Sequence, residues 1–244
     1  MTSYQSASSK KENMRNVVRI VLLCALALGL AACSTTKYVP EGSYLLDDVR
    51  IRTDNKEVRP SQLSMYVRQH PNSKWFSLIK TQLYVYNWSG RDSTKWINRV
   101  LRRMGDAPVI YSHEETERTT EEITKAVRNM GYMGATVEPV REVSGREMTL
   151  TYRVQTGKPY RVNTLKLDVQ DERIADYMRQ DSAATLLKEG MIFDVNVLDA
   201  ERQRITSNLL RHGYYKFNKD YITYTADTVR NTYLVDLTLH LAPF

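Results

Sequence analysis

The sequence predicts an α+β protein made of two tandem modules with the same order of elements, βααββ. The first observation is an internal repeat, because the stretch 111–132 recurs at 193–214, an offset of 82 residues. Each copy contains an aromatic residue, a capping side chain, an amphipathic helix and a Gly-Tyr pair. The second observation is that alternating apolar and polar stretches surround each copy, as strands would. Because a repeat of this period defines the unit of folding, we expect modules at 44–158 and 159–244.

The first 32 residues have the layout of a secretory signal peptide. Four Lys and Arg side chains lie between positions 10 and 19, an apolar run covers Val17–Leu30, and Ala31, Ala32 and Cys33 follow. Leu-Ala-Ala-Cys resembles a bacterial lipobox, in which the cysteine becomes the lipidated first residue of the mature protein. A transmembrane anchor is the alternative, but a bilayer needs about 20 apolar residues. We therefore expect a lipoprotein with lipid on Cys33.

The cysteine content and charge that would remain after removal of this signal peptide argue against thiol catalysis and nucleic-acid binding. Cys24 would be lost with it, so the mature chain would keep only Cys33, which leaves neither an intrachain disulfide nor a catalytic thiol. The whole chain has a net charge of +7, and residues 1–32 contribute +3 from four Lys and Arg and one Glu, which leaves +4. This excess is dispersed and forms no continuous basic helix or strand. We therefore expect no nucleic-acid partner.

Residues 33–43 are expected to form the lipidated cysteine and a tether to the first module. The stretch Ser34–Ser43 is polar, contains Pro40 and Gly42, and shows no periodicity. No acidic side chain directly follows Cys33, whereas such residues would resemble the surface-export signal of Bacteroidota lipoproteins. This difference favours modules that face the periplasm.

Module one is expected to begin with a strand and two helices. Tyr44–Thr53 alternates loosely as a strand, and Pro60 suits the first turn of a helix that Pro71 would end. The repeated helix runs from about Glu114 to Met130, with an apolar stripe on one side. Two further strands and the turn that joins them follow at 133–140, 148–154 and Ser144-Gly145.

An insertion at about 72–107 has no counterpart in module two. It contains all three tryptophans of the chain, Trp75, Trp88 and Trp96. The stretch Trp96–Met104 predicts a short helix with an apolar face that ends at Gly105, and 75–79 predicts another apolar turn. One interpretation is a partner-binding surface, because Trp and Arg are enriched at interface hot spots. We expect the other one, in which the insertion packs its aromatic side chains onto the module or against the lipid-proximal surface.

Module two repeats the order of module one without the insertion. A strand over 165–169 precedes a helix over 173–180, and the second copy of the repeated helix begins after Asp194, a good N-cap. In that helix Leu198, Ile205 and Leu209 should be buried, and Arg202 and Arg204 should face solvent. A hairpin of strands over 221–226 and 233–241 closes the module.

A Gly-Tyr pair ends each repeated helix, and these pairs are predicted to be structural. Glycine can adopt the left-handed conformation that closes a helix, and the tyrosine would pack back over the last turn. The four residues concerned are Gly131, Tyr132, Gly213 and Tyr214.

The sequence does not predict an enzyme, a metal site or a cofactor. The four histidines lie singly in different predicted elements, without the spacing of metal ligands. His113-Glu114-Glu115 resembles half of a zinc-protease motif but lacks the second histidine. Neither a Gly-rich phosphate loop nor a Gly-x-Ser-x-Gly nucleophile turn is present, so an enzymatic function is not expected.

The order of elements and the pattern of the second repeat resemble a POTRA domain (polypeptide-transport-associated). The pattern reads Phe193-Asp194-x₃-Leu198-x₃-Arg202-x₂-Ile205-x₃-Leu209-x₃-Gly213-Tyr214. The resemblance covers all of 159–244 and is weaker in module one, where Thr116 and Thr120 replace the expected Leu and Arg. Together with the lipobox, Gly105–Val109 and the insertion, the chain resembles the N-terminal part of the Bacteroidota translocation and assembly module lipoproteins (TamL), relatives of BamA and TamA in the Omp85 superfamily.

This resemblance implies an outer-membrane lipoprotein with a function in outer-membrane protein assembly. Such proteins carry periplasmic POTRA domains ahead of an outer-membrane β-barrel that helps to insert other proteins. The implied partners are unfolded outer-membrane protein clients and a TamB-like protein that bridges the envelope. A barrel is absent from the stretch up to Phe244, so we expect either part of a longer protein or a stand-alone POTRA adaptor lipoprotein.

The resemblance also implies a mechanism, because the third strand of a POTRA sheet lies in the middle and leaves the second at an edge. An edge strand can take up an extended peptide through main-chain hydrogen bonds. The candidate edge residues are Met133, Ala135 and Val137 in module one, and Tyr221, Ile222, Thr223, Tyr224 and Thr225 in module two. Glu138 and Pro139 would blunt the first edge, so we favour the second. Alternatively, both edges pair with neighbouring modules or remain solvated.

A glycan-binding surface lipoprotein is the remaining alternative. In that case Trp75, Trp88 and Trp96 would form a stacking platform open to solvent. The missing acidic residues after Cys33 and the internal repeat both argue against this interpretation.

Overall fold

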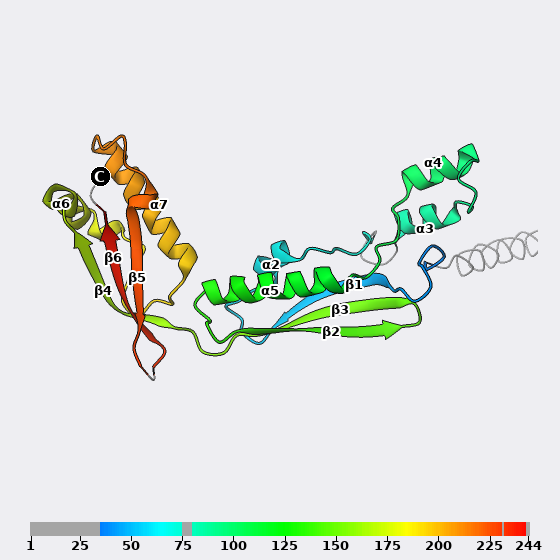
Figure 1. Cartoon of the computed structure of the whole chain (residues 1–244), viewed down its shortest axis with the longest axis horizontal. Coiled ribbons are helices and arrows are strands. Elements are labelled where there is room, and N and C mark those ends of the chain that lie inside the picture. Colours follow the sequence, from blue (N-terminus) through cyan, green and yellow to red (C-terminus); the bar gives the residue numbers. More distant parts are fainter. Residues whose placement is uncertain (1–34, 75–79, 231, 243–244) are drawn as a thin grey trace, which may run out of the picture. The chain divides into compact units, whose positions relative to one another are not determined.

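The structure is a computed structural model that describes residues 35–74, 80–230 and 232–242 (Figure 1). The predicted signal peptide, the expected lipid-bearing Cys33 and Trp75 lie outside the described residues. Of the helices that are described, none is long and apolar enough to cross a membrane. The elements confirm the predicted α+β class, with two three-stranded sheets and helices in tandem.

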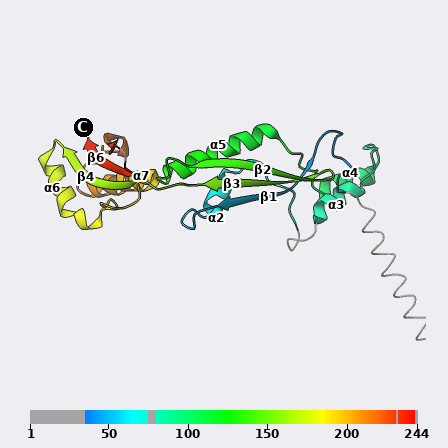
Figure 2. The same ribbon diagram turned by 90° about the horizontal axis from the view of Figure 1, so that it is seen from below.

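The first module contains a sheet, the repeated helix and the helices of the insertion. Its elements in chain order are β1 (Leu45–Thr53), α2 (Pro60–Leu63), the 3-10 helix η1 (Ser64–Tyr66), α3 (Thr81–Trp88), α4 (Trp96–Met104), α5 (His113–Asn129), β2 (Thr136–Ser144) and β3 (Glu147–Gln155). The three strands lie in the order β1-β3-β2 (Figure 2), so the third strand is in the middle, as expected. Gly145, with a φ of 61°, forms the turn between β2 and β3.

The second module has the same order of elements. They are β4 (Arg161–Val169), α6 (Glu172–Gln180), the 3-10 helix η2 (Ser182–Ala184), α7 (Val195–Arg211), the 3-10 helix η3 (Lys219–Tyr221), β5 (Ile222–Thr228) and β6 (Leu234–Leu241). The strand order is β4-β6-β5, in which β4 is parallel and β5 antiparallel to β6. The third strand is again central.

The chain separates into two compact units that differ from the expected modules. One unit draws on 1–49, 70–112 and 141–150, and the other on 50–69, 113–140 and 151–244. Strands β1, β2 and β3 each contribute residues to both units. The division into these units therefore lies within the strands, whereas the sequence repeat suggests a division near residue 158.

Three predicted boundaries are wrong. Met133 and Ala135 do not belong to a strand, because β2 begins at Thr136, and Ala135 instead donates its amide to the Tyr132 carbonyl in a turn (2.9 Å). Tyr221 ends the 3-10 turn η3 and precedes β5. The helix expected up to Pro71 ends at Tyr66, because the amide of Arg68 donates to the Thr119 hydroxyl instead of continuing the helix (3.1 Å).

The repeated helices α5 and α7 bury equivalent side chains. Ile123 corresponds to Ile205 and Val127 to Leu209, and all four are buried. Thr116, which replaces the expected leucine, is also buried, at the position equivalent to Leu198. The small, partly polar threonine therefore fills a core position that leucine fills in the second module.

A Schellman motif closes α5. The amide of Tyr132 donates to the carbonyl of Val127 (3.3 Å), and the amide of Gly131 donates to that of Arg128 (2.9 Å). Gly131 has a φ of 95°, the left-handed conformation that this motif requires. The Tyr132 side chain is buried, and its hydroxyl donates to a Glu57 carboxylate oxygen (2.9 Å). The tyrosine therefore packs over the last turn and also holds the loop after β1.

The same motif closes α7 at the offset of the sequence repeat. The amide of Tyr214 donates to the carbonyl of Leu209 (3.1 Å), the amide of Gly213 donates to that of Leu210 (3.2 Å), and Gly213 has a φ of 92°. The amide of Phe217 donates to the Tyr214 carbonyl (2.9 Å), matching the bond from Ala135 in the first module. The repeat thus extends from residue types to individual hydrogen bonds.

The core of the second module lies between its sheet and the helices α6 and α7 (Figure 1). Ile174 of α6, Ile205 and Leu209 of α7 and Leu239 of β6 belong to one buried cluster. A second cluster joins Leu198 of α7 to the beginning of β4 and to β6. The helices therefore bury their apolar stripes against one face of the sheet, as the periodicity predicts.

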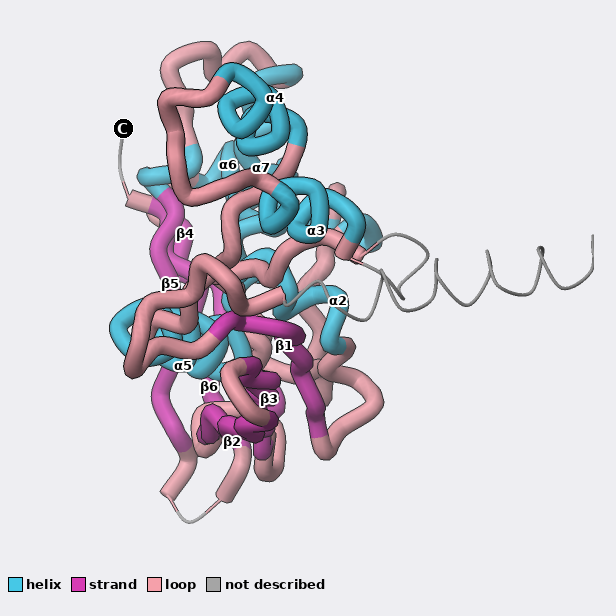
Figure 3. Tube along the Cα trace, turned by 90° about the vertical axis from the view of Figure 1, so that its right-hand side faces the viewer, coloured by secondary structure: helices cyan, strands magenta, loops and turns pink. Residues whose placement is uncertain are grey.

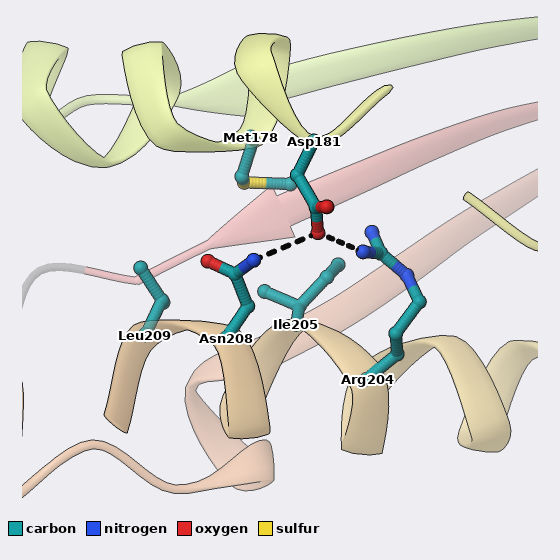
Figure 4. A pocket seen from close by; sticks show the side chains of 6 residues that line it. All are labelled: Met178, Asp181, Arg204, Ile205, Asn208 and Leu209. Atoms are coloured by element: carbon teal, nitrogen blue, oxygen red, sulfur yellow. Dashed lines mark hydrogen bonds and ion pairs between the residues drawn. The ribbon is translucent and has the colours of Figure 1, made fainter. Parts of the chain in front are cut away.

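Polar contacts also join α6 to α7 beside this core (Figure 4). Asp181 accepts a hydrogen bond from the Asn208 amide (2.8 Å) and pairs with the guanidinium group of Arg204. The side chain of Arg204 is only 20% exposed, so the expectation that it faces solvent is wrong. Because its charge meets carboxylates on two sides, the arginine can lie against the core without losing its ionic partners.

The carboxylate of Glu201 is the buried partner of Arg204. The two side chains are 2.8 Å apart, and the carboxylate also accepts hydrogen bonds from the Thr185 hydroxyl (2.8 Å) and the Leu186 amide (3.0 Å). Burial raises the pKa of Glu201, but the hydrogen bonds from Arg204, Leu186 and Thr185 lower it by a larger amount. The pKa of Glu201 therefore lies below its ordinary value. The ionised carboxylate is therefore favoured in the folded state.

We predict that alanine is tolerated less well at Gly131 than at Gly213. Both substitutions would force a residue with a Cβ into the left-handed region, which costs about 1–2 kcal/mol. At Gly131 the Cβ would also lie 2.6 Å from Ile192 Cγ2 and 2.7 Å from the Phe193 carbonyl oxygen, whereas at Gly213 nothing lies within 4 Å. Urea unfolding should show a greater loss of stability for G131A than for G213A. Gly134→Ala, in open space, is the control, and equal losses at Gly131 and Gly213 would refute the prediction.

We predict that Glu201 makes the second module sensitive to acid. Since its folded pKa is depressed, its contribution to stability is complete above the ordinary pKa of 4.5 and is lost as the pH falls through the folded pKa. Glu201→Gln should cost about 2 kcal/mol at pH 7 and should flatten the pH dependence of unfolding below pH 4.5. Asp176→Asn, in an exposed pair with Arg179, is the matched control. It should change neither the stability at pH 7 nor the pH dependence of unfolding appreciably.

Candidate interaction edges and insertion surface

Strand β5 forms an edge of the second sheet. Its residues pair with β6 from Ile222, opposite Leu241, to Thr228, opposite Val235. Because β6 lies between β4 and β5, the other side of β5 has no strand beside it within its sheet. This side is the candidate edge for an added peptide.

The ladder between β5 and β6 identifies which backbone groups face outward. The amide of Ala242 donates to the Tyr221 carbonyl (2.9 Å), and the amide of Val229 donates to the Leu234 carbonyl (3.0 Å). Bonded and non-bonded pairs alternate along an antiparallel ladder. In the observed register, the residues whose amides and carbonyls point away from β6 are therefore Ile222, Tyr224, Ala226 and Thr228.

The opposite edge of this sheet is covered where β4 begins. The amide of Val162 donates to the Met191 carbonyl (2.9 Å), and the amide of Gly190 donates to the Val162 carbonyl (2.7 Å). Arg161 and Ile192 also form an isolated bridge. The segment before α7 therefore occupies backbone groups of β4, and β5 is the more accessible edge.

The side chains of β5 fix the strand to the core and leave its outer end in solvent. Ile222 is buried, and Tyr224 is half-buried against both core clusters, with its hydroxyl donating to the Leu198 carbonyl (3.3 Å). Burial, with the negative charge of Glu201, raises the pKa of Tyr224 well above its ordinary value, so the phenol stays protonated. Thr223 and Thr225 are exposed. An added peptide would therefore meet a strand that is packed on the core through Ile222 and Tyr224 and carries small polar side chains on its exposed face.

A polar row crosses the exposed face of the same sheet. His240 of β6 lies between the Asp168 carboxylate of β4 (2.8 Å) and the Thr225 hydroxyl of β5 (2.9 Å). Sequence reasoning treated this histidine as isolated, because the pairing register that brings the three residues together is not visible in the sequence. The row connects all three strands and so stabilises the position of β5.

The corresponding edge in the first module is β2. Most of its side chains are half-buried or exposed, with Val137 half-buried. Pro139 lies within the strand and lacks an amide donor. This edge therefore offers fewer hydrogen bonds to an added peptide than β5 does.

The insertion exposes its tryptophans. Helices α3 and α4 lie next to each other, joined by a loop (Figure 3). Trp88 at the end of α3 is 59% exposed and Trp96 at the start of α4 is 70% exposed. The expectation that these two aromatic side chains pack onto the module is therefore wrong, whereas packing against the lipid-proximal surface stays a prediction. Besides Leu83, the buried residues of the insertion include the polar Asn87, Ser89 and Asn98.

The segment 35–40, expected to be part of a tether, is packed against the insertion. The ammonium group of Lys37 donates to the carbonyls of Asn87 and Ser89 at the end of α3, each at 2.8 Å. The Tyr38 hydroxyl donates to the Ser89 carbonyl (2.6 Å), and the Arg102 guanidinium lies 5.4 Å from the centre of its ring. The tether expectation is wrong for these residues, because their polar side chains find buried partners that sequence composition does not reveal.

The first module matches a known family. Residues 44–157, slightly less than half of the chain, match the POTRA family model, described as surface antigen variable number repeat. POTRA domains of Omp85 proteins are protein-interaction modules without enzymatic activity, in agreement with the expectation of no enzyme for the matched residues. Within the described part of the chain, no group of three or more His, Cys, Asp or Glu side chains could hold a metal ion. No curated protein matches the sequence.

Several solved structures are similar to the chain at low identity. BamA from Haemophilus ducreyi lacking POTRA domains 1–3 is 15% identical with a TM-score of 0.37, and the similarity covers 82% of this chain and 29% of that one. POTRA3–5 of Haemophilus influenzae BamA is 14% identical with a TM-score of 0.33 and coverage of 84% and 100%. POTRA1–2 of Omp85 from Anabaena is 13% identical with a TM-score of 0.36 and coverage of 84% and 99%. The chain thus spans less than a third of the Haemophilus ducreyi chain.

Proposed function

We propose that this chain is the periplasmic arm of an outer-membrane protein assembly factor of the TamL type, anchored by lipid on Cys33. The POTRA match of residues 44–157 supports the class of assembly factor. The signal peptide and the lipobox-like Leu-Ala-Ala-Cys support the anchor and the periplasmic location. Its proposed partners are unfolded outer-membrane proteins and a TamB-like protein.

The open edge of β5 is the observation that carries this proposal. An extended segment of an unfolded barrel protein can add beside β5 and bond to the outward amides and carbonyls of Ile222, Tyr224, Ala226 and Thr228. Such bonds involve only the main chain, so binding does not depend on one particular sequence. This suits a protein that receives many clients, each with strands of alternating apolar and polar residues.

The insertion supplies a second proposed surface. Trp88 and Trp96 are exposed side chains of a type enriched at binding hot spots, and Arg99 and Arg103 lie beside Trp96 on α4. Trp75, which the sequence groups with them, lies outside the described residues. The β5 edge and the insertion are formed by different residues, so peptide binding by β5 and partner binding by the insertion can be tested with separate substitutions.

We predict that proline at Ala226 weakens peptide binding without breaking the β5–β6 ladder. The amide of Ala226 points away from β6, so Ala226→Pro removes one donor from the open edge and presents a bulky ring to an incoming strand. We expect an affinity about five- to tenfold lower for a ten-residue peptide of alternating apolar and polar residues, measured by fluorescence anisotropy.

Ala226→Val is the matched control, because it keeps the amide and suits a strand. It should bind the peptide as the native chain does. Thermal unfolding of both variants should show that the second module remains folded. If the folded proline variant binds with native affinity, β5 is not the peptide-binding edge.

A further inference from the structure

Helix α4 presents an apolar face to solvent. Trp96, Val100 and Met104 recur every four residues and therefore lie on one side of the helix, and Ile97 adjoins them. All four side chains are exposed. The side of α4 that faces the protein carries Asn98, which is buried and donates its side-chain amide to the Asp92 carbonyl (2.7 Å), beside the half-buried Leu101 and Arg102. The helix is thus oriented with its apolar face outward.

Positive charge lies beside this apolar face. Arg99 and Arg103, one turn apart, line an open groove of about 350 Å³ together with Trp96 and Val100. The helix contains four basic or polar residues and no acidic residue. A surface that combines exposed Trp and aliphatic side chains with arginines suits the boundary between acyl chains and anionic phosphate groups.

The N-terminal segment brings the insertion close to Cys33. The Asn87 side-chain amide of α3 donates to the Thr35 carbonyl (3.0 Å), and Lys37 is bonded to the end of the same helix. Only Ser34 separates Cys33 from Thr35, and even a fully extended chain spans no more than about 7 Å over these two steps. Acyl chains on Cys33 would therefore enter a bilayer next to the α3–α4 pair.

We propose that the exposed face of α4 lies on the surface of the membrane that holds the lipidated Cys33. Trp96, Ile97, Val100 and Met104 enter the interface, and Arg99 and Arg103 bind phosphate groups of anionic phospholipids. This inference depends on the lipid anchor in the proposed function. The face acts as a second attachment beside the acyl chains, and two such signals together anchor a protein more stably than one.

Tryptophan fluorescence in vesicles tests this arrangement with the full chain. A variant with Trp75→Phe and Trp88→Phe keeps Trp96 as its single tryptophan, and it is attached to phosphatidylcholine vesicles with and without phosphatidylglycerol. We expect blue-shifted emission from Trp96 and quenching by brominated phosphatidylcholine roughly twice that of a control tryptophan. The control is Tyr215→Trp in a chain whose three tryptophans are phenylalanine, because Tyr215 is exposed in the second module.

The arginines are tested in the same vesicles. Arg99→Gln with Arg103→Gln should lower the quenching of Trp96 in anionic vesicles to the level found in phosphatidylcholine alone, since each basic side chain contributes through the surface charge. Lys216→Gln, an exposed charge in the second module, should leave it unchanged. An equal effect of both changes would overturn the assignment of the arginines.

The outcomes separate the two proposals. If the chain attaches through Cys33, so that Cys33→Ser abolishes attachment, but Trp96 keeps water-like emission and is not quenched, the inference about α4 is overturned and the lipid anchor stands. If the chain with native Cys33 does not attach at all, the anchor fails, and the membrane position of α4 fails with it.

Discussion

The central position of the third strand in each sheet determines which strand edges this protein leaves open to solvent. In the second module β6 uses both of its sides, one in parallel pairing with β4 and the other in antiparallel pairing with β5. The two outer strands each keep one unpaired side, and the segment before α7 covers the beginning of β4. The alternation of the β5–β6 ladder then sets which amides face outward. The proposed peptide binding therefore depends on topology more than on any particular side chain.

The two Schellman motifs have the same local geometry but different surroundings. Gly131 and Gly213 have nearly the same φ and the same pair of hydrogen bonds, so the helix ends are equivalent. Gly131 also approaches the Phe193 carbonyl too closely for any side chain, and its own carbonyl accepts a hydrogen bond from the Tyr160 amide (2.9 Å). The first glycine therefore serves both the helix end and a close backbone approach, whereas the second serves the helix end alone.

Elements defined by local pattern could be predicted from the sequence, and features defined by distant polar contacts could not. Apolar periodicity located α5 and α7 with their buried Ile123 and Ile205, and the repeat identified both helix ends. The packing of the N-terminal segment could not be predicted because the partners of Lys37 lie 50 and 52 residues away along the chain. Arg204 was misplaced for a similar reason, since Asp181 lies 23 residues earlier. The β5 edge was placed correctly except for Tyr221, because strand alternation does not show where a preceding 3-10 turn ends.

Helix α4 illustrates a different limit of pattern reasoning. Its apolar stripe was identified correctly, but a stripe specifies only that one side of a helix differs from the other, not which side the protein covers. Here the protein covers Asn98 and half-buries Arg102, which donates to the Gly90 carbonyl (3.0 Å), and leaves Trp96 and Met104 outside. In water this orientation exposes apolar surface, and no hydrophobic burial compensates for the cost. In the proposed position at the membrane the outward face would meet acyl chains instead, and the orientation would be favourable because the bilayer would replace water as its solvent.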